Sequence, residues 1–196
     1  MTERLRRRLE FFLETDRMKY VIRRTPVGNV SRKENDAEHS FSLALLAMVL
    51  EEYADDNVSI DRVIRMALVH DLIEIYAGDT YVYDQAAMET KAAREDAAAE
   101  KLFGMLPREQ GKEYEALWRE FDAEETPDAR FAACLDHFQP LLMNYYTDGV
   151  SWLEHNVCRS QVVHRMQIIR EVFPMLYELV EAMLSDAVRR GWLRDE

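Results

Sequence analysis

Two histidines of this chain lie beside or within apolar segments, where burying an imidazole costs free energy unless it binds a partner. His39 ends the polar segment ENDAEH and precedes the apolar LALLAMVL, while His70 lies in the apolar run MALVHDLIEIYA with Asp71 beside it. An adjacent pair of ionisable side chains in an apolar segment loses several kcal/mol of hydration unless something compensates for the loss. A bound metal ion compensates efficiently, because imidazole and carboxylate groups are both good metal ligands.

Asp136 repeats this pattern in the segment ARFAACLDHFQPLL, where it is a lone carboxylate among apolar residues. A single buried polar group is usually a hydrogen-bonded core residue, so no one of the three segments indicates a metal by itself. The three together do, because each places an unexplained polar group on an apolar background. We therefore predict one divalent metal ion (Mn, Co, Zn, Fe, Ni or Mg), with these ligands: His39, His70, Asp71 and Asp136.

The composition indicates which elements position these residues. The chain has 196 residues, 48% of them hydrophobic, with only 6 Gly and 5 Pro. The length suits one domain with a full core, and the scarcity of turn formers favours long helices. Apolar spacing predicts helices over residues 4–18, 37–54, 60–77, 88–104, 107–121, 127–146 and 157–190, the last bent at Pro174.

The expected architecture is therefore an all-α, single-domain bundle of about seven helices spanning residues 1–196. Its chemistry-bearing motifs fall within residues 35–145, and the helix over 157–190 is expected to pack on that region. Residues 23–36 carry Pro26, Gly28 and many polar groups, so we predict a long functional loop there. No segment requires a strand.

Charge and cysteine usage limit the classes of function. The net charge of −12 argues against unspecific nucleic-acid binding, although a metal and a few arginines can still create a locally positive site. No apolar run reaches the length of about 18 residues that a membrane span needs, and the N-terminus lacks a signal peptide. The two cysteines form no CxxC pair, so the simplest expectation is a reducing, cytoplasmic compartment.

The order H…HD…D, formed by His39, His70-Asp71 and Asp136, resembles the signature of the HD-domain phosphohydrolase superfamily. The segments NVSRKENDAEHS, HDLIEIYAGD and ARFAACLDHFQPLL are similar to three motifs of its 5′-deoxynucleotidases, including the group called HD domain-containing protein 2. The resemblance covers roughly residues 10–180. It implies a helical HD-type fold, hydrolysis of deoxyribonucleoside 5′-monophosphates to deoxynucleoside and phosphate, and commonly a homodimer.

The resemblance also suggests catalytic residues. Glu74 and Asp79 occupy the matching places of the HDxxExxxGD motif. Glu74 follows His70 by four residues, so on a continuous helix it lies on the same face and could orient or deprotonate a water. Asp79 follows the expected helix end at Gly78 and could serve the leaving 5′-oxygen.

A phosphate also needs a cationic clamp, which arginine provides best because it binds through two nitrogens. Arg24 matches the phosphate-binding arginine of the family, and a shift by one residue would select Arg23 instead. Lys91 is a weaker candidate, as are Arg32, Lys33 and Arg94. The next residue, Thr25, stands where the family's nucleotidases carry Trp, so the sugar preference is open.

Alternatives within and outside the family remain. Two-metal cyclic-nucleotide phosphodiesterases need further histidines between the HD pair and the last Asp, and this chain has none there. Hydrolases of guanosine polyphosphates carry adjacent Glu-Asp after the HD pair, whereas Ile75 follows Glu74 here, which weakens that option; a nucleoside-triphosphate hydrolase is a related one. A different class is a non-catalytic helical module whose metal is structural, with every coordination position filled by protein.

Overall fold

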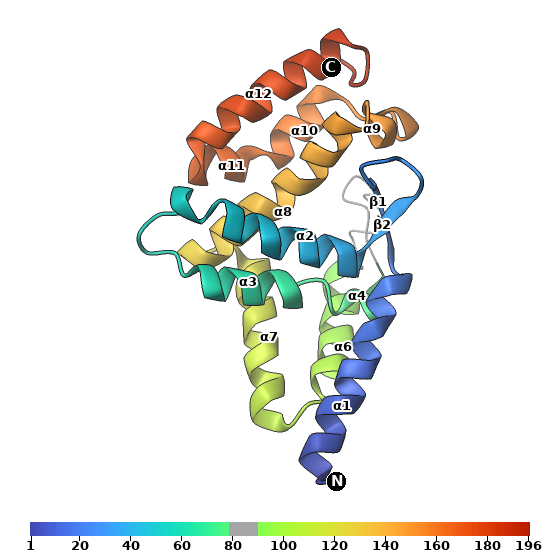
Figure 1. The fold of residues 1–196 in the computed structure, drawn as a ribbon, viewed down its shortest axis with the longest axis vertical. Coiled ribbons are helices and arrows are strands. Elements are labelled where there is room, and N and C mark those ends of the chain that lie inside the picture. Colours follow the sequence, from blue (N-terminus) through green and yellow to red (C-terminus); the bar gives the residue numbers. More distant parts are fainter. Residues whose placement is uncertain (79–89) are drawn as a thin grey trace.

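The computed structural model describes residues 1–78 and 90–196, which form a helical assembly with one small hairpin (Figure 1). Asp79 and the expected helix start at residues 88 and 89 lie outside the described residues. Within them, no helix is both long and apolar enough to cross a membrane.

Three helices form the centre of the fold: α2 (Asp36–Val49), α3 (Ile60–Val69) and α8 (Pro127–Tyr146). Each packs on the other two, as Figure 1 shows for the middle of the molecule. Asn35 caps α2, with the Glu38 side chain returning to the Asn35 backbone N–H. Thr126 caps α8 and Pro127 opens it, as their order predicts. These three helices and the turn after α3 carry all four predicted ligands.

A second group of helices extends from this centre towards the N-terminus. It consists of α1 (Glu3–Thr15), with the 3₁₀ turn η1 (Asp16–Tyr20) after it, α6 (Lys91–Phe103) and α7 (Arg108–Ala123). The predicted helices over 4–18, 88–104 and 107–121 are confirmed apart from their ends. A further 3₁₀ turn, η2 (Glu51–Tyr53), follows α2 and closes the segment predicted as helix 37–54.

The prediction that no strands occur was wrong. Residues expected to form a loop contain β1 (Ile22–Pro26) and β2 (Lys33–Asn35), paired antiparallel with a register shift between Ile22 and Pro26. Thr25 and Glu34 are buried on this hairpin. Buried backbone must find hydrogen-bond partners, and the ladder supplies them. The hairpin therefore converts a polar segment into a rigid wall beside α2.

The expected helix over 60–77 is interrupted. α3 ends at Val69, residues 70–73 form a turn, and α4 (Glu74–Ala77) follows. The turn is tightened by bonds between residues three apart, from Leu72 N to Val69 O (3.1 Å) and from Glu74 N to Asp71 O (3.0 Å). The HD pair therefore lies at the end of α3 and not inside a continuous helix.

The expected helix over 157–190 is divided into three: α10 (Arg159–Arg165), α11 (Gln167–Val172) and α12 (Pro174–Arg189). Pro174 lacks a backbone N–H and opens α12 instead of bending a longer helix. The short helix α9 (Val150–Glu154) precedes these three in the chain. α11 packs on α8, and α12 packs on α11. The all-α class is correct, but the helices are more numerous and shorter than predicted.

Candidate metal centre

Three of the predicted ligands meet from three separate elements. His39 comes from α2, His70 from the turn after α3, and Asp136 from α8, with one ligand atom of each within 4.8 Å of the others. His39 Nε2 lies 2.8 Å from Asp136 Oδ1, and His70 Nε2 lies 3.8 Å from the same oxygen. Both histidines are buried, so the group lies inside the helical core.

Asp71 joins the same centre. Its Oδ2 lies 3.0 Å from His70 Nε2 and 3.8 Å from His39 Nε2. On a continuous helix, consecutive side chains point about 100° apart, which would restrict the ion to a position between them. In the structure both members of the HD pair reach one point, directly after the end of α3.

The far nitrogens of the two imidazoles are held by acceptors that fix the ring orientation. His70 Nδ1 lies 2.9 Å from the carbonyl oxygen of Ala67, and His39 Nδ1 lies 3.3 Å from Gln139 Oε1. In both rings Nδ1 therefore donates, and Nε2 is the nitrogen that faces the carboxylates and would ligate a metal ion. His70 Nε2 is buried and accepts no hydrogen bond from the described residues, which suits a metal ligand.

The electrostatics of this centre favour a cation. Burial opposes charge on every group here, yet Asp71 and Asp136 raise the pKa of His70 to about 10. Despite the same burial, the two histidines hold the pKa of Asp136 well below its usual range. The pKa of Asp71 is likewise lowered by His70 and Arg23. Two ionised carboxylates with two imidazoles are a donor set into which a divalent metal fits.

Behind the ligands lies a buried network that the sequence did not reveal. Gln139 Nε2 donates to Glu34 Oε2 at 3.2 Å, and Glu34 Oε1 lies 3.6 Å from Arg23 Nε. Gln139 follows Asp136 by three residues, a spacing that could have indicated a shared helix face. Glu34 gave no such signal, because its position depends on the hairpin. Burial raises the pKa of its carboxyl group.

Of the two adjacent arginines, the structure brings Arg23 to the centre. Arg23 Nη1 lies 2.8 Å from Asp71 Oδ2 and 3.4 Å from Asp36 Oδ1. Side chains alternate along a strand, so Arg24 points to the opposite face of β1 and is exposed. A loop has no regular alternation of side-chain direction, so the predicted loop could not show which of the two arginines faces the centre. The buried Thr25 lies on the same face as Arg23.

The remaining predicted site residues have these positions. Glu74 opens α4, and its charge helps to raise the pKa of Arg23, so it borders the centre. Lys91 pairs with Glu95 at 3.0 Å on α6. The other weak phosphate candidates also have partners: Arg32 binds Glu38, Lys33 binds Glu154 and Arg94 donates to the carbonyl of Ala77.

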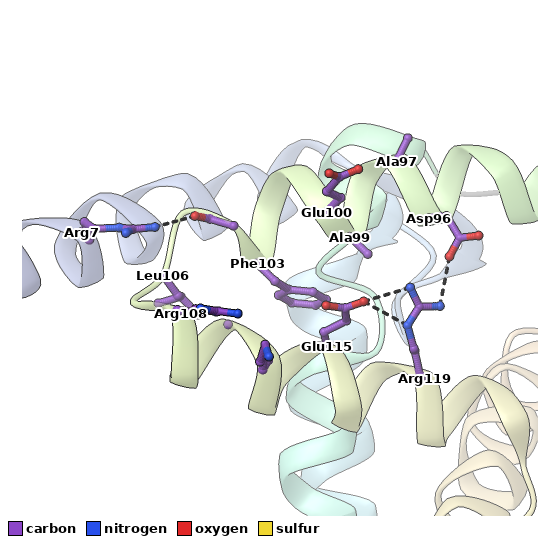
Figure 2. Close-up of a pocket in the computed structure, with 13 residues that line it drawn as sticks. Arg7, Asp96, Ala97, Ala99, Glu100, Phe103, Leu106, Arg108, Glu115 and Arg119 are labelled. Carbon is purple, nitrogen blue, oxygen red and sulfur yellow. Dashed lines mark hydrogen bonds and ion pairs between the residues drawn. The ribbon is translucent and has the colours of Figure 1, made fainter.

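A separate cavity of about 910 Å³ lies between α6 and α7, with Arg7 of α1 at one end (Figure 2). Three of its charged groups bind one another, since Arg119 donates to Glu115 and to Asp96. It contains none of the predicted ligands. The chemistry expected from the sequence therefore does not belong to this cavity.

Together, the helical fold and the inward-facing His, His, Asp and Asp group define a candidate site for a divalent metal. The sequence pattern described as HD domain matches residues 15–177. The chain belongs to the HD domain family.

Relatives and a solved structure agree with this assignment. The chain is 32% identical over 159 residues to the human 5′-deoxynucleotidase HDDC2, covering 81% of this chain and 74% of that protein. The mouse 5′-deoxynucleotidase HDDC2 is 35% identical over 159 residues, covering 81% and 76%. A predicted metal-dependent phosphohydrolase from Magnetospirillum magnetotacticum MS-1 superposes with a TM-score of 0.93 at 47% identity, covering 97% and 95% of the two chains.

Proposed function

We propose that this chain is a 5′-nucleotidase that releases phosphate from deoxyribonucleoside and ribonucleoside 5′-monophosphates. The observation that carries the proposal is Arg23, a phosphate-binding type of side chain, in contact with the predicted ligand Asp71. A purely structural metal site needs no guanidinium beside it. The similarity to 5′-deoxynucleotidases supports the nucleotide as substrate.

In this proposal Arg23 holds the substrate phosphate. Its guanidinium can exchange part of its contact with Asp71 for two phosphate oxygens while the rest of the side chain stays in place. Asp36 and Glu34 keep it oriented from the hairpin side. The phosphorus atom is thereby fixed next to the metal ligands.

Glu74 accepts a proton from the attacking water as the water oxygen forms its bond to phosphorus. The bond between phosphorus and the 5′-oxygen then breaks, and Asp79 delivers a proton to that oxygen, so that phosphate and nucleoside leave. A divalent ion held by the four ligands would polarise a phosphoryl oxygen and lower the pKa of water in the site. Its identity among Mn, Co, Zn, Fe, Ni and Mg is left to measurement.

The test is phosphate release from a panel of nucleoside 5′-monophosphates by protein stripped of metal and reloaded with Mn, Co, Zn or Mg. Asp71→Ala is expected to lose both bound metal and turnover. Glu74→Gln is expected to keep its metal content and to lose turnover by roughly 10²-fold to 10⁴-fold. Glu100→Gln, an exposed carboxylate on α6, is the matched control and should behave as wild type.

Three outcomes would contradict the proposal. Unchanged turnover in metal-free protein would remove the metal from the reaction. Full metal binding without hydrolysis of any nucleoside monophosphate would instead favour the non-catalytic module with a structural ion. Hydrolysis confined to guanosine polyphosphates or nucleoside triphosphates would keep the class of enzyme and change the substrate.

We also propose that the protein is a cytoplasmic homodimer. Both cysteines are free thiols, which suits a reducing compartment. Four apolar side chains of α1 face outward with exposed fractions between 46% and 70%, as a surface for a second copy would: Leu5, Leu9, Phe12 and Leu13.

A further inference from the structure

A second pocket adjoins the metal centre on the side of α10. It has a volume of about 430 Å³, within the usual range for small-molecule sites. Its walls come from the end of α7, from α8, and from α10 and α11. The lining residues are mostly polar in type, but the surface they present to the pocket is mainly apolar. Glu124, His137, Arg165 and Ile168 are the lining residues that matter here.

Arg165 forms the boundary between this pocket and the centre. Its Nη2 lies 3.9 Å from Asp136 Oδ2, the carboxylate oxygen turned away from His39. The backbone of Arg165 is fixed as well, because its carbonyl oxygen accepts a hydrogen bond from His137 Nδ1 at 2.9 Å. Consecutive residues of α8 thus contact the centre and the pocket wall.

Glu124 closes the pocket from α7. Its backbone has a left-handed φ of 50°, the common conformation of a residue that ends a helix. One turn earlier, Phe121 packs against the ring of His70, with centroids 4.6 Å apart. The Glu124 carboxylate is half-buried and makes no hydrogen bond or ion pair with residues of the described part of the chain. Burial, with the charge of Asp136, raises its pKa.

We propose that this pocket binds the nucleoside half of the substrate, with Glu124 accepting a hydrogen bond from a sugar hydroxyl and Arg165 at the junction of sugar and phosphate. This assignment rests on the proposed nucleotidase function and adds the part of the site that recognises the nucleoside. A half-buried carboxylate without a partner is matched by a hydroxyl donor, and its burial makes that bond strong.

The two parts of a nucleotide suit the two neighbouring sites. The doubly anionic phosphate belongs with Arg23 and the cation-binding centre, and the neutral nucleoside belongs in the adjoining pocket. Ile168 offers an apolar surface, and the planar groups of His137 and Arg165 offer surfaces on which a flat base can stack. Arg165 lies between both halves, so it can contact either a phosphate oxygen or the ester oxygen.

The test compares a nucleotide with a phosphomonoester that has no nucleoside. Glu124→Gln is expected to raise KM for deoxynucleoside 5′-monophosphates by roughly 10-fold to 100-fold and to leave turnover of phenyl phosphate unchanged. Arg165→Met is expected to raise KM for the same nucleotides, and its metal content is measured in parallel because Asp136 is its neighbour. The matched controls are the exposed Glu125→Gln and Arg65→Met, whose partner Glu113 lies outside the pocket.

Binding of free deoxynucleosides, measured by calorimetry, gives a readout that needs no turnover. Wild-type protein is expected to bind deoxyadenosine, and Glu124→Gln to bind it at least about 10-fold more weakly. Nucleotide hydrolysis in which both pocket variants match their controls would overturn the pocket assignment and leave the nucleotidase function intact. Absence of nucleotide hydrolysis in wild type, with phenyl phosphate still cleaved, would instead overturn the nucleotide substrate.

Discussion

At the scale of single residues, Gln139 links the metal centre to the hairpin. Its amide oxygen lies 3.3 Å from His39 Nδ1 while its amide nitrogen donates to Glu34. The sequence showed the two imidazoles and two carboxylates, because charged and titratable groups are conspicuous on apolar helices. It could not show Gln139, since an amide in a helix carries no comparable signal.

Gln139→Leu is expected to weaken metal binding by about 10-fold to 100-fold, the usual effect of losing a group that orients a ligating histidine. The leucine leaves His39 Nδ1 without its acceptor while keeping a similar volume. The measurement is competition for metal with a chelator of known affinity. Gln110→Leu on α7, which loses only a bond from Arg8, is the control, and equal metal affinity in both variants would contradict the role of Gln139.

The side chains of Arg23 and Arg24 point to opposite faces of β1, so substituting each in turn tests which arginine binds the substrate phosphate. Arg23→Met is expected to raise KM for nucleoside monophosphates by at least about 10-fold, because the charge-assisted bonds to phosphate are lost. Arg24→Met, on the exposed face of β1, should change KM less than about 2-fold. Steady-state kinetics on both variants decides between them, and the opposite ranking would return the phosphate clamp to Arg24.

At the scale of elements, the turn over residues 70–73 could not be predicted. Apolar periodicity runs through this segment, and neither Gly nor Pro marks an end before Gly78. The hairpin escaped prediction for a similar reason, since its residues are polar and its partner strand is only three residues long. The α8 boundaries, by contrast, followed directly from Thr126-Pro127.

The contact between α1 and α4 gives a prediction with a defined pH dependence. Tyr76 of α4 donates to Glu14 Oε1 of α1 at 2.7 Å. This bond, with Arg17, holds the pKa of Glu14 below its usual 4.5. A carboxyl group whose pKa is lowered by folding stabilises the fold above its unfolded pKa, and this stabilisation is lost as the pH falls through the folded value. Tyr76→Phe is therefore expected to lower the unfolding free energy by about 1–2 kcal/mol at neutral pH.

The difference between Tyr76→Phe and wild type should shrink as the pH is lowered below about 4.5, because a protonated Glu14 is a weaker acceptor in both proteins. Urea unfolding across this range measures it. Tyr114→Phe is the matched control. Tyr114 of α7 also contacts α1, but it does so through its ring, which packs edge-on against the ring of Phe11. A difference that stays constant down to about pH 3 would show that the Glu14 carboxylate is not the acceptor that matters.

At the scale of the whole molecule, two apolar stripes stay exposed and are not covered by the residues that the structure describes. One is the α1 stripe of Leu5, Leu9, Phe12 and Leu13, whose helical spacing predicted an amphipathic helix but not which way it faces. The other lies on α2 and consists of four exposed side chains: Phe41, Leu45, Met48 and Val49. The turn η1 contacts both helices. At their exposed fractions, each stripe of four side chains offers roughly 400 Å² per copy, so the proposed dimer, which needs about 800 Å² from each partner, uses both stripes.

Phe12→Glu is expected to convert the proposed homodimer to monomer, because the interface would bury two unpaired carboxylates, one from each copy. Leu45→Glu should do the same from the α2 stripe. Met175→Glu, equally exposed on α12, is the control and should leave the dimer intact. Light scattering after size exclusion gives the mass, and thermal unfolding shows that each variant is folded. Because both substitutions point to solvent within one chain, a monomeric wild type, or a dimer that persists in both stripe variants, would exclude these stripes as the interface.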